Sequence, residues 1–532
     1  MLSEDRVCVA LLFCATFGVG SMNFGSIFAA AGPLVASLAI YFLSACNLHA
    51  SVAVSKALSV SPISVRTFSD LGYYAFGSTG RRVVLASEAG VCYLTPIAFF
   101  ILGGTSLLPH MFDDVVEKSS TEWIGIMAIM VLPIILIPTL KAAAPLCILG
   151  GIVAILTDVI CITFSFSELP FSPRETEIEV NNVITTFGTI MFAMGTAVII
   201  PPIQRQHSDP SRLANLVTIT LLYITSIYML IGIITYYQFG CTAPNTLLDE
   251  LPAGSWKKTA STLMFLHVLV AFPVLLTPTL FDLERFILGK DADVEVLQQT
   301  IAMRAAKLTA GKPILSNAPT VASLDDDGFL YGSSSSGSVD TASTTVYFQA
   351  HSPTRSALEP SSSNANGSSS STLARTSSSG SIGFFEDYAA IETTFTARDR
   401  ICSALIRTMT ITSQAFFAIM LQNCFMDILS LIGATAVTLS CMIMPCLCYL
   451  KVFPIPTHLF IGRCDRALCY LIIIISSVLG IYCSIIAAIN IRDHMSQYKL
   501  FAPVNVTDTA TVLDDSDALL DQYPYCHVGE RN

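Results

Sequence analysis

Three ionisable side chains lie deepest within the long apolar runs of the sequence. They are Asp158 in the run 145–167, Glu88 in the run 82–109 and His267 in the run 258–288. A charge in the hydrocarbon core of a membrane is costly unless it is paired or solvated, so such residues often belong to ion or proton pathways. All three can exchange a proton, and we therefore treat them as candidates for proton coupling.

Each of these residues also has a structural interpretation. Asp158 could be a hydrogen-bonded structural carboxyl, and Glu88 could pair with Arg81 or Arg82 near one end of its run. His267 could be a packing histidine whose ring nitrogens are satisfied by neighbouring groups.

Two further runs contain residues that interrupt a helix. Gly18-Val19-Gly20-Ser21 falls in the middle of the run 6–30, and the run 182–203 contains Gly188, Gly195-Thr196 and Pro201-Pro202. Glycine costs about 1 kcal/mol relative to alanine inside a helix, and proline removes a backbone donor. These runs would begin the two halves of a five-plus-five arrangement, which indicates an inverted repeat with a binding site between broken helices. The alternative is that the glycines only allow close helix packing.

Broken helices would suit a zwitterionic ligand. Backbone N–H groups and the positive end of a half-helix attract a carboxylate, and freed carbonyl groups attract a cation or an ammonium group.

The elements that carry these residues are expected to be membrane helices. Hydrophobic residues make up 53% of the 532 residues and charged residues only 13%, whereas a soluble domain has roughly 25% charged residues. A spanning helix needs about 20 apolar residues. Eleven runs meet that length, and they predict an all-α polytopic membrane protein: 6–30, 33–57, 82–109, 122–140, 145–167, 182–203, 213–239, 258–288, 401–423, 426–450 and 467–490.

Positive charge predicts how these helices are oriented. Lys and Arg gather in alternate short loops, and the other loops are richer in acids, which places the N-terminus in the cytoplasm and the C-terminus outside or in a lumen. Arg6 and the apolar run after it resemble a signal peptide, but Glu4, Asp5 and the length of the run favour a retained first helix.

The chain divides into four predicted regions. Helices one to eight occupy 1–290, a Ser-rich cytoplasmic loop occupies 291–397, helices nine to eleven occupy 398–490, and an acidic outside or lumenal tail occupies 491–532. The loop has no apolar run long enough to pack, so we expect it to be disordered.

The predicted tail contains two sites of covalent chemistry. Asn505-Val506-Thr507 is an acceptor sequence for glycosylation. Cys526 could form a disulfide bond with Cys241, which is expected on the same side of the membrane.

Several function classes are disfavoured by the residues present. Most of the 16 cysteines lie in apolar runs, without the spacing of a zinc or disulfide framework. We find no metal cluster, cofactor motif or nucleophile–base spacing, and no basic patch for nucleic acid. An enzyme is therefore not predicted.

The ordered motifs resemble the amino acid/auxin permease family of the APC superfamily, which includes vesicular inhibitory and neutral amino-acid transporters. Each motif is weak by itself, but their order and spacing follow the family. They are Phe17–Gly20 with Ala31-Gly32, Thr67–Gly72 with Phe76-Gly77 as the loop before helix three, Gly188–Ala193 with Pro201–Gln204, Phe272-Pro273 with Pro278, Asp427–Ala434 and Met444–Leu450.

This resemblance implies a fold and a set of binding residues. It implies eleven helices, the first ten in the LeuT-type inverted repeat, and an amino acid as substrate. Gly18, Val19, Gly20 and Ser21 would bind the substrate carboxylate, and Phe192, Gly195 and Thr196 would contact its amino group or side chain. Two departures affect substrate preference: Gly25 replaces a usual proline, and Ala197 replaces a common histidine.

The sequence therefore predicts a secondary transporter of amino acids, proton-coupled (a symporter) or facilitative, in the plasma membrane or a vacuolar or vesicular membrane. Protons are favoured over sodium because Val268–Phe272 contains no Ser/Thr pair that would suit a sodium site. The alternative function is an amino-acid sensor on a transporter scaffold, which would bind its ligand without net flux.

Overall fold

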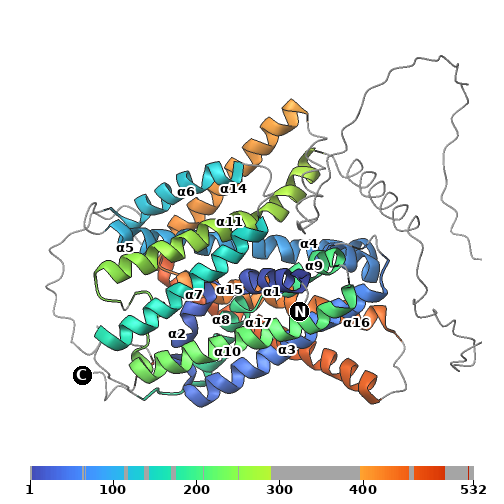
Figure 1. Cartoon of the computed structure of the whole chain (residues 1–532), viewed down its shortest axis with the longest axis horizontal. Helices are drawn as coiled ribbons and strands as arrows, with labels where there is room; N and C mark the ends of the chain where they lie inside the picture. The colour runs from blue at the N-terminus through green and yellow to red at the C-terminus, as the bar shows by residue number, and fades with distance from the viewer. Residues whose placement is uncertain are drawn as a thin grey trace, which may run out of the picture. The chain divides into compact units, whose positions relative to one another are not determined.

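Long apolar helices make up nearly all of the chain that the structure, a computed structural model, describes (Figure 1). The described residues are 3–62, 65, 67–112, 118–136, 143–168, 175–207, 209–249, 251–288, 396–454, 460–497 and 525–526. All of them belong to one compact unit. The predicted Ser-rich loop, apart from its last two residues, and the acceptor site at Asn505 lie outside the described residues.

Most of the helices follow one another closely in the chain, whereas residues 289–396 separate α11 from α14. In chain order they are α1 (Ser3–Thr16), η1 (Val19–Asn23), α2 (Phe24–Ala31), α3 (Pro33–Val60), α4 (Phe68–Leu102), η2 (Gly103–Leu107), α5 (Leu108–Phe112), α6 (Ser120–Leu136), α7 (Ala143–Glu168), α8 (Val180–Ala193), η3 (Ala197–Ile199), α9 (Ile200–Gln206), η4 (Pro210–Arg212), α10 (Leu213–Phe239), η5 (Gly240–Thr242), α11 (Ser255–Leu288), α14 (Ala397–Met420), α15 (Phe425–Ile432), η6 (Gly433–Val437), η7 (Leu439–Ile443), α16 (Met444–Val452) and α17 (Phe460–Gln497). The described part contains no strand, only an isolated bridge between Thr176 and Cys526.

The lengths and hydropathy of these helices confirm a polytopic membrane protein. Within the described residues, eight spans are long and apolar enough to cross a membrane, or nine if the bent pair formed by α1 and η1–α2 counts as one. The predicted spans 122–140 and 401–423 fall on α6 and α14, which are not among those nine. The count of eleven spans and the inverted repeat therefore remain predictions.

One predicted loop is helical. Residues 68–76, expected in the loop before helix three, form the first turns of α4. Thr67 Oγ1 accepts the Asp70 N–H at 3.1 Å, and Asp70 Oδ2 accepts the Thr67 N–H at 3.0 Å. This capping box satisfies two donors at the start of the helix. Gly77, with φ of +65°, then kinks α4 in a conformation that a side chain would strain.

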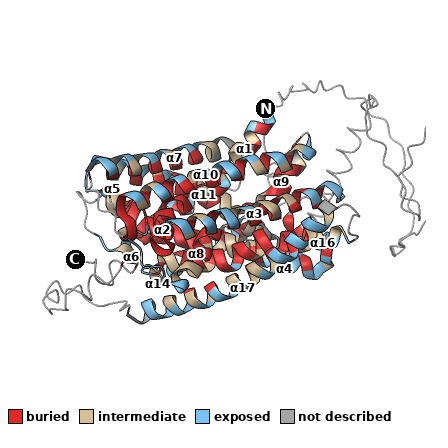
Figure 2. Cartoon of the chain, turned by 90° about the horizontal axis from the view of Figure 1, so that it is seen from below, coloured by how far each residue is buried: buried red, intermediate tan, exposed pale blue. Residues whose placement is uncertain are grey.

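Buried residues lie on the inward sides of the helices, and every residue of the half-helix α2 is buried (Figure 2). Phe24 and Tyr228 stack with ring centroids 4.2 Å apart, and both side chains are fully buried. The last helix, α17, is the least buried of the candidate spans, so most of its apolar surface faces outward.

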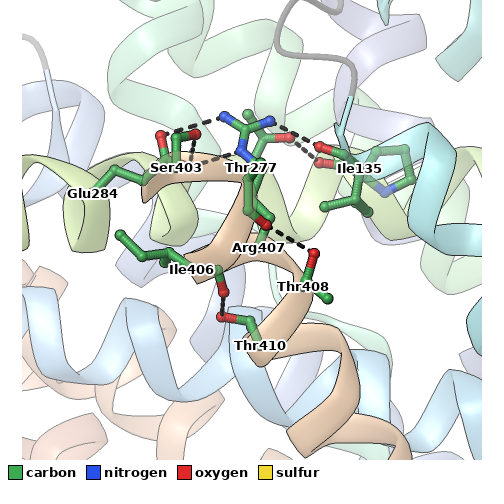
Figure 3. Close-up of polar contacts among 10 residues, drawn as sticks. Ile135, Thr277, Glu284, Ser403, Ile406, Arg407, Thr408 and Thr410 are labelled. Atoms are coloured by element: carbon green, nitrogen blue, oxygen red, sulfur yellow. Dashed lines mark hydrogen bonds and ion pairs between the residues drawn. The ribbon is translucent and has the colours of Figure 1, made fainter. Parts of the chain in front are cut away.

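A buried ion pair joins α6, α11 and α14 (Figure 3). Arg407 Nε donates to Glu284 Oε1 at 2.7 Å, and Arg407 Nη1 donates to the Ile135 carbonyl at 2.8 Å. Ser403 Oγ also donates to Glu284 Oε1, at 2.8 Å. Glu284 is 1% exposed and Arg407 6%, so the two charges depend on each other and on these hydrogen bonds.

A disulfide bond joins Cys241 to Cys526, with Cα atoms 5.1 Å apart. It confirms the pairing that the sequence allowed. The Tyr525 carbonyl accepts the Glu177 N–H at 3.1 Å, so residues 525–526 connect the segment before α8 with the segment after α10.

The ion pair generates a stability prediction. We expect Arg407→Met to lower the free energy of unfolding by about 3–5 kcal/mol, because it leaves the Glu284 carboxylate buried without its partner. The double variant Glu284→Met/Arg407→Met should recover most of that loss, since no charge then remains. Thermal melting of the purified protein in detergent measures both. A double variant as unstable as Arg407→Met would show that the pair is not what stabilises this junction.

Candidate functional site

The first helix is interrupted where the sequence predicts it. α1 ends at Thr16, η1 begins at Val19, and the two halves are bent by 49°. Gly18 lies in the interruption with an extended backbone. A Cβ atom on Gly18 would overlap Nε2 of His267 on α11, so glycine is needed here for the close approach of a neighbouring side chain.

The sixth predicted helix is interrupted at Met194–Thr196, between α8 and η3. Pro201 and Pro202 lie in the first turn of α9, where a missing N–H costs nothing. They therefore start the second half-helix and do not break the first. Gly188 is not at the break either: a Cβ there would overlap the backbone of Ser430. For Gly188, the packing interpretation is the correct one.

The two interruptions meet. Thr16 Oγ1 lies 3.0 Å from Thr196 Oγ1. On α10, Tyr228 Oη lies 3.1 Å from the Thr16 carbonyl oxygen and 3.0 Å from that of Ala193. These are the last carbonyl groups of α1 and α8, which a break leaves without helical partners. One buried hydroxyl group therefore lies within hydrogen-bond distance of both helix ends, and it can donate its single proton to either carbonyl or share it between them.

A second polar side chain serves the break after α8. Asn47 on α3 donates from Nδ2 to the Met194 carbonyl at 2.7 Å, and Thr196 Oγ1 donates to the same carbonyl at 3.2 Å. Backbone groups freed inside an apolar environment must find such partners. α3 and α10 supply them here.

Asp158 on α7 contacts the interrupted part of helix one. Its Oδ2 lies 2.7 Å from Ser21 Oγ, which is also 2.9 Å from the Gly18 carbonyl oxygen. Asp158 is 3% exposed, and its Oδ1 has no hydrogen-bond partner among the described residues. A serine hydroxyl has one proton to donate. Both Ser21 contacts can be hydrogen bonds together only if Asp158 carries a proton and donates it to Ser21.

His267 on α11 contacts the same interruption at Gly18. Its Nδ1 is 2.9 Å from the Gly150 carbonyl of α7, so Nδ1 carries hydrogen, and its Nε2 faces Gly18. The interruption of helix one therefore contacts two ionisable side chains: Asp158 through Ser21, and His267 at Gly18.

The other predicted site residues occupy different positions. Gly20 packs on α8, because a Cβ there would lie 2.8 Å from the Ala193 Cβ. Val19 is buried, and Phe192 and Gly195 are half-buried near the second interruption. Glu88 is half-buried on α4, and none of the contacts above includes it.

Sequence reasoning missed several polar residues of this region. Tyr228 and Asn47 are single polar side chains in apolar runs, a signal too common to separate them from surface residues. The contacts of Asp5, which stands beside Glu4 and Arg6, were also missed. Its Oδ1 is 3.0 Å from His207 Nε2 and its Oδ2 is 2.8 Å from Arg212 Nη2. The start of α1 is thereby tied to the segment that follows α9.

A known protein family matches most of the chain in sequence. The sequence profile of the family described as "Transmembrane amino acid transporter protein" matches residues 6–490. The chain belongs to this family. The resemblance drawn from the motifs is therefore confirmed, and the family is one of transporters and not of enzymes.

Individual members of the family are distant relatives. Amino acid transporter AVT1J of Arabidopsis thaliana is 23% identical over 276 residues, which cover 50% of this chain and 64% of that protein. Amino acid transporter AVT3B of Arabidopsis thaliana is 24% identical over 314 residues, covering 53% and 72%. The proton-coupled amino acid transporter-like protein pathetic of Drosophila melanogaster is 21% identical over 289 residues, covering 51% and 61%. The chain thus spans less than two thirds of the first and third of these relatives.

The contact of helix one with α8 generates a prediction about Gly20. We expect Gly20→Ala to lower the free energy of unfolding by about 1–3 kcal/mol, because the added methyl overpacks against Ala193. Combining it with Ala193→Gly removes the opposing methyl and should restore part of the stability. Thermal melting in detergent is the measurement. A Gly20→Ala variant as stable as wild type would mean that the two segments are not in contact.

Proposed function

We propose that this membrane protein is a secondary transporter that moves amino acids by alternating access, coupled to protons. The observation that carries the proposal is the junction of the two interruptions at Thr16, Thr196 and Tyr228. Family membership supports the substrate class, since relatives are named as amino acid transporters.

The substrate would bind at this junction. N–H groups of the interrupted segment Gly18–Ser21 would hold the carboxylate, because they precede a new half-helix. Those of Gly18, Val19 and Gly20 are the candidates, since the Ser21 N–H donates to the Gly18 carbonyl at 2.9 Å. Phe192, Gly195 and Thr196 would contact the amino group or side chain. Because the α-carbon of Gly20 packs against α8, only its N–H group could contact the substrate.

Asp158 is the proton carrier that we propose. When it is protonated, it donates to Ser21, and Ser21 donates to the Gly18 carbonyl. When it is ionised, Ser21 donates to the carboxylate, and the Gly18 carbonyl loses that donor. Protonation of Asp158 on α7 therefore changes the hydrogen bonding of the segment that would hold the substrate. This is the linkage between proton and substrate that symport requires. His267 and Glu88 are secondary candidates for proton coupling, and sodium is the less favoured ion.

Movement of the half-helices would open and close the site. The tie of Asp5 to His207 and Arg212 holds the start of α1 against the segment after α9. In alternating access such a contact must form in one state and break in the other. We propose that it closes one entrance to the site.

The disulfide bond supports the proposed orientation. Disulfides persist outside the cell or in oxidising lumens and are rare in the cytosol. Cys241 and Cys526 would then face the outside or a lumen, with the N-terminus in the cytoplasm. The membrane of residence would be the plasma membrane or a vacuolar or vesicular membrane.

Uptake of radiolabelled amino acids into proteoliposomes tests the function. We expect uptake that rises with an inward proton gradient and does not depend on sodium. A protein that binds amino acids without net flux would be a sensor and would overturn the proposal.

Substitution of Asp158 tests the coupling. We expect Asp158→Asn to abolish concentrative uptake driven by a pH gradient, because an amide keeps the shape but cannot take up a proton. Ser21→Ala should weaken the response to pH, since it removes the hydroxyl through which protonation reaches Gly18. If Asp158→Asn still concentrates substrate under a pH gradient alone, the proton is carried elsewhere.

The orientation is tested with tags at the two ends of the chain. In sealed microsomes whose cytoplasmic face is outward, we expect added protease to remove an N-terminal tag and spare a C-terminal tag. Detergent should expose both. Digestion of the C-terminal tag in sealed microsomes would place both termini on the same side.

A further inference from the structure

Asn23, the last residue of η1, is a buried side chain without a partner. It is 0% exposed, and neither Nδ2 nor Oδ1 has a hydrogen-bond partner among the described residues. Its backbone carbonyl does have a partner, since it accepts a hydrogen bond from Ser26 Oγ at 2.8 Å.

An unpaired amide in this position needs an explanation. A carboxamide can donate two hydrogen bonds and accept two, and buried polar atoms without a partner are rare because they destabilise the fold. The nearby hydroxyl groups of Ser21 and Ser26 both have partners. The protein therefore keeps a polar side chain where its own described groups leave it unsatisfied, as binding sites do.

The geometry of η1 shows where this amide points. In a 3₁₀-helix, side chains three residues apart lie on the same face. Asn23 therefore shares the face of Gly20, which packs on Ala193 at the end of α8. Both η1 and α2 pack on α8, so residues after Gly20 face the earlier turns of α8.

Thr189 lies one turn before Ala193 on α8 and is therefore on the same face. Its side chain is 7% exposed. Thr185 and Thr186, one turn earlier, donate to carbonyls of their own helix at 2.9 and 2.7 Å. By this geometry the unpaired amide of Asn23 and the hydroxyl of Thr189 lie at one level between helix one and α8.

We propose that Asn23, together with Thr189, determines substrate specificity by hydrogen bonding to a polar, uncharged side chain of the amino acid. This inference rests on the proposed function. Three residues of 3₁₀-helix rise about 6 Å, so Asn23 lies about that far beyond Gly20 and the N–H groups proposed for the carboxylate. Four or five bonds of about 1.5 Å carry the hydroxyl or carboxamide of a substrate across such a distance.

The chemistry of the pair excludes other side chains. Neither Asn23 nor Thr189 is charged, so an acidic or basic substrate side chain would be buried without a counter-charge. An aliphatic side chain would leave the amide and the hydroxyl unpaired. Hydroxyl and carboxamide amino acids fit both requirements.

Isosteric substrate pairs test the inference in proteoliposomes. We expect wild type to prefer threonine over valine and asparagine over leucine by about tenfold or more in kcat/KM. Asn23→Leu should lower both ratios by about tenfold, and Thr189→Val should lower them in the same direction. Asn181→Leu, the same change at an exposed position at the start of α8, should leave the ratios unchanged.

A stability measurement separates specificity from structure. Asn23→Leu should not lower the melting temperature, because it removes an amide that has no partner in the fold. Threonine and asparagine should raise the melting temperature of wild type more than that of this variant. If Asn23→Leu does not fold, Asn23→Ala gives the same comparison.

The outcomes distinguish this inference from the proposed function. Absence of uptake for every amino acid by wild type would overturn the proposed function. Uptake with ratios that Asn23→Leu leaves unchanged would overturn only the role of Asn23. A large loss of stability in both Asn23 variants would show a structural hydrogen bond and would also overturn it.

Discussion

The demand that backbone polar groups stay hydrogen-bonded inside an apolar environment governs this structure. A helix that crosses a membrane can be interrupted only where other groups replace its lost hydrogen bonds. Here the single proton of Tyr228 Oη lies within reach of the last carbonyls of both α1 and α8, and Asn47 Nδ2 donates to the Met194 carbonyl. α10 and α3 are therefore needed for the interruptions to exist, and the interruptions in turn place Ser21 beside Asp158.

Small residues decide how closely these helices approach. Gly18 makes room for His267, Gly20 for Ala193 and Gly188 for Ser430. In membranes such contacts replace much of the hydrophobic driving force that soluble proteins use. Glycines that look alike in the sequence therefore have different roles. Gly18 lies within an interruption, whereas Gly188 lies within a continuous helix.

The two buried carboxyl groups Glu284 and Asp158 differ in their surroundings. Glu284 is held by Arg407 and Ser403, so its charge is compensated and it suits a structural role. Asp158 is held by one serine hydroxyl, and its other oxygen has no partner in the described chain. A proton can be gained or lost there with a smaller loss of hydrogen bonding, which is why we propose Asp158 as the proton carrier.

The sequence by itself determined the class of protein and the location of the interruption in helix one, because apolar length and clustered glycine are local properties of a chain. It also indicated Asp158, since a carboxyl within an apolar run stands out without any knowledge of its neighbours. Local patterns included the interruption of the sixth helix at Gly195-Thr196, but they also counted Gly188 and Pro201-Pro202, which lie outside it. The resemblance placed residues 68–76 in a loop, whereas they are helical in α4. Proline and glycine have effects that depend on their position within a helix. Only the tertiary structure showed that Tyr228 joins the two interruptions, that Glu284 is paired and that Asn23 is not. Those properties depend on contacts between residues far apart in the chain, and no local pattern records which polar side chain finds a partner.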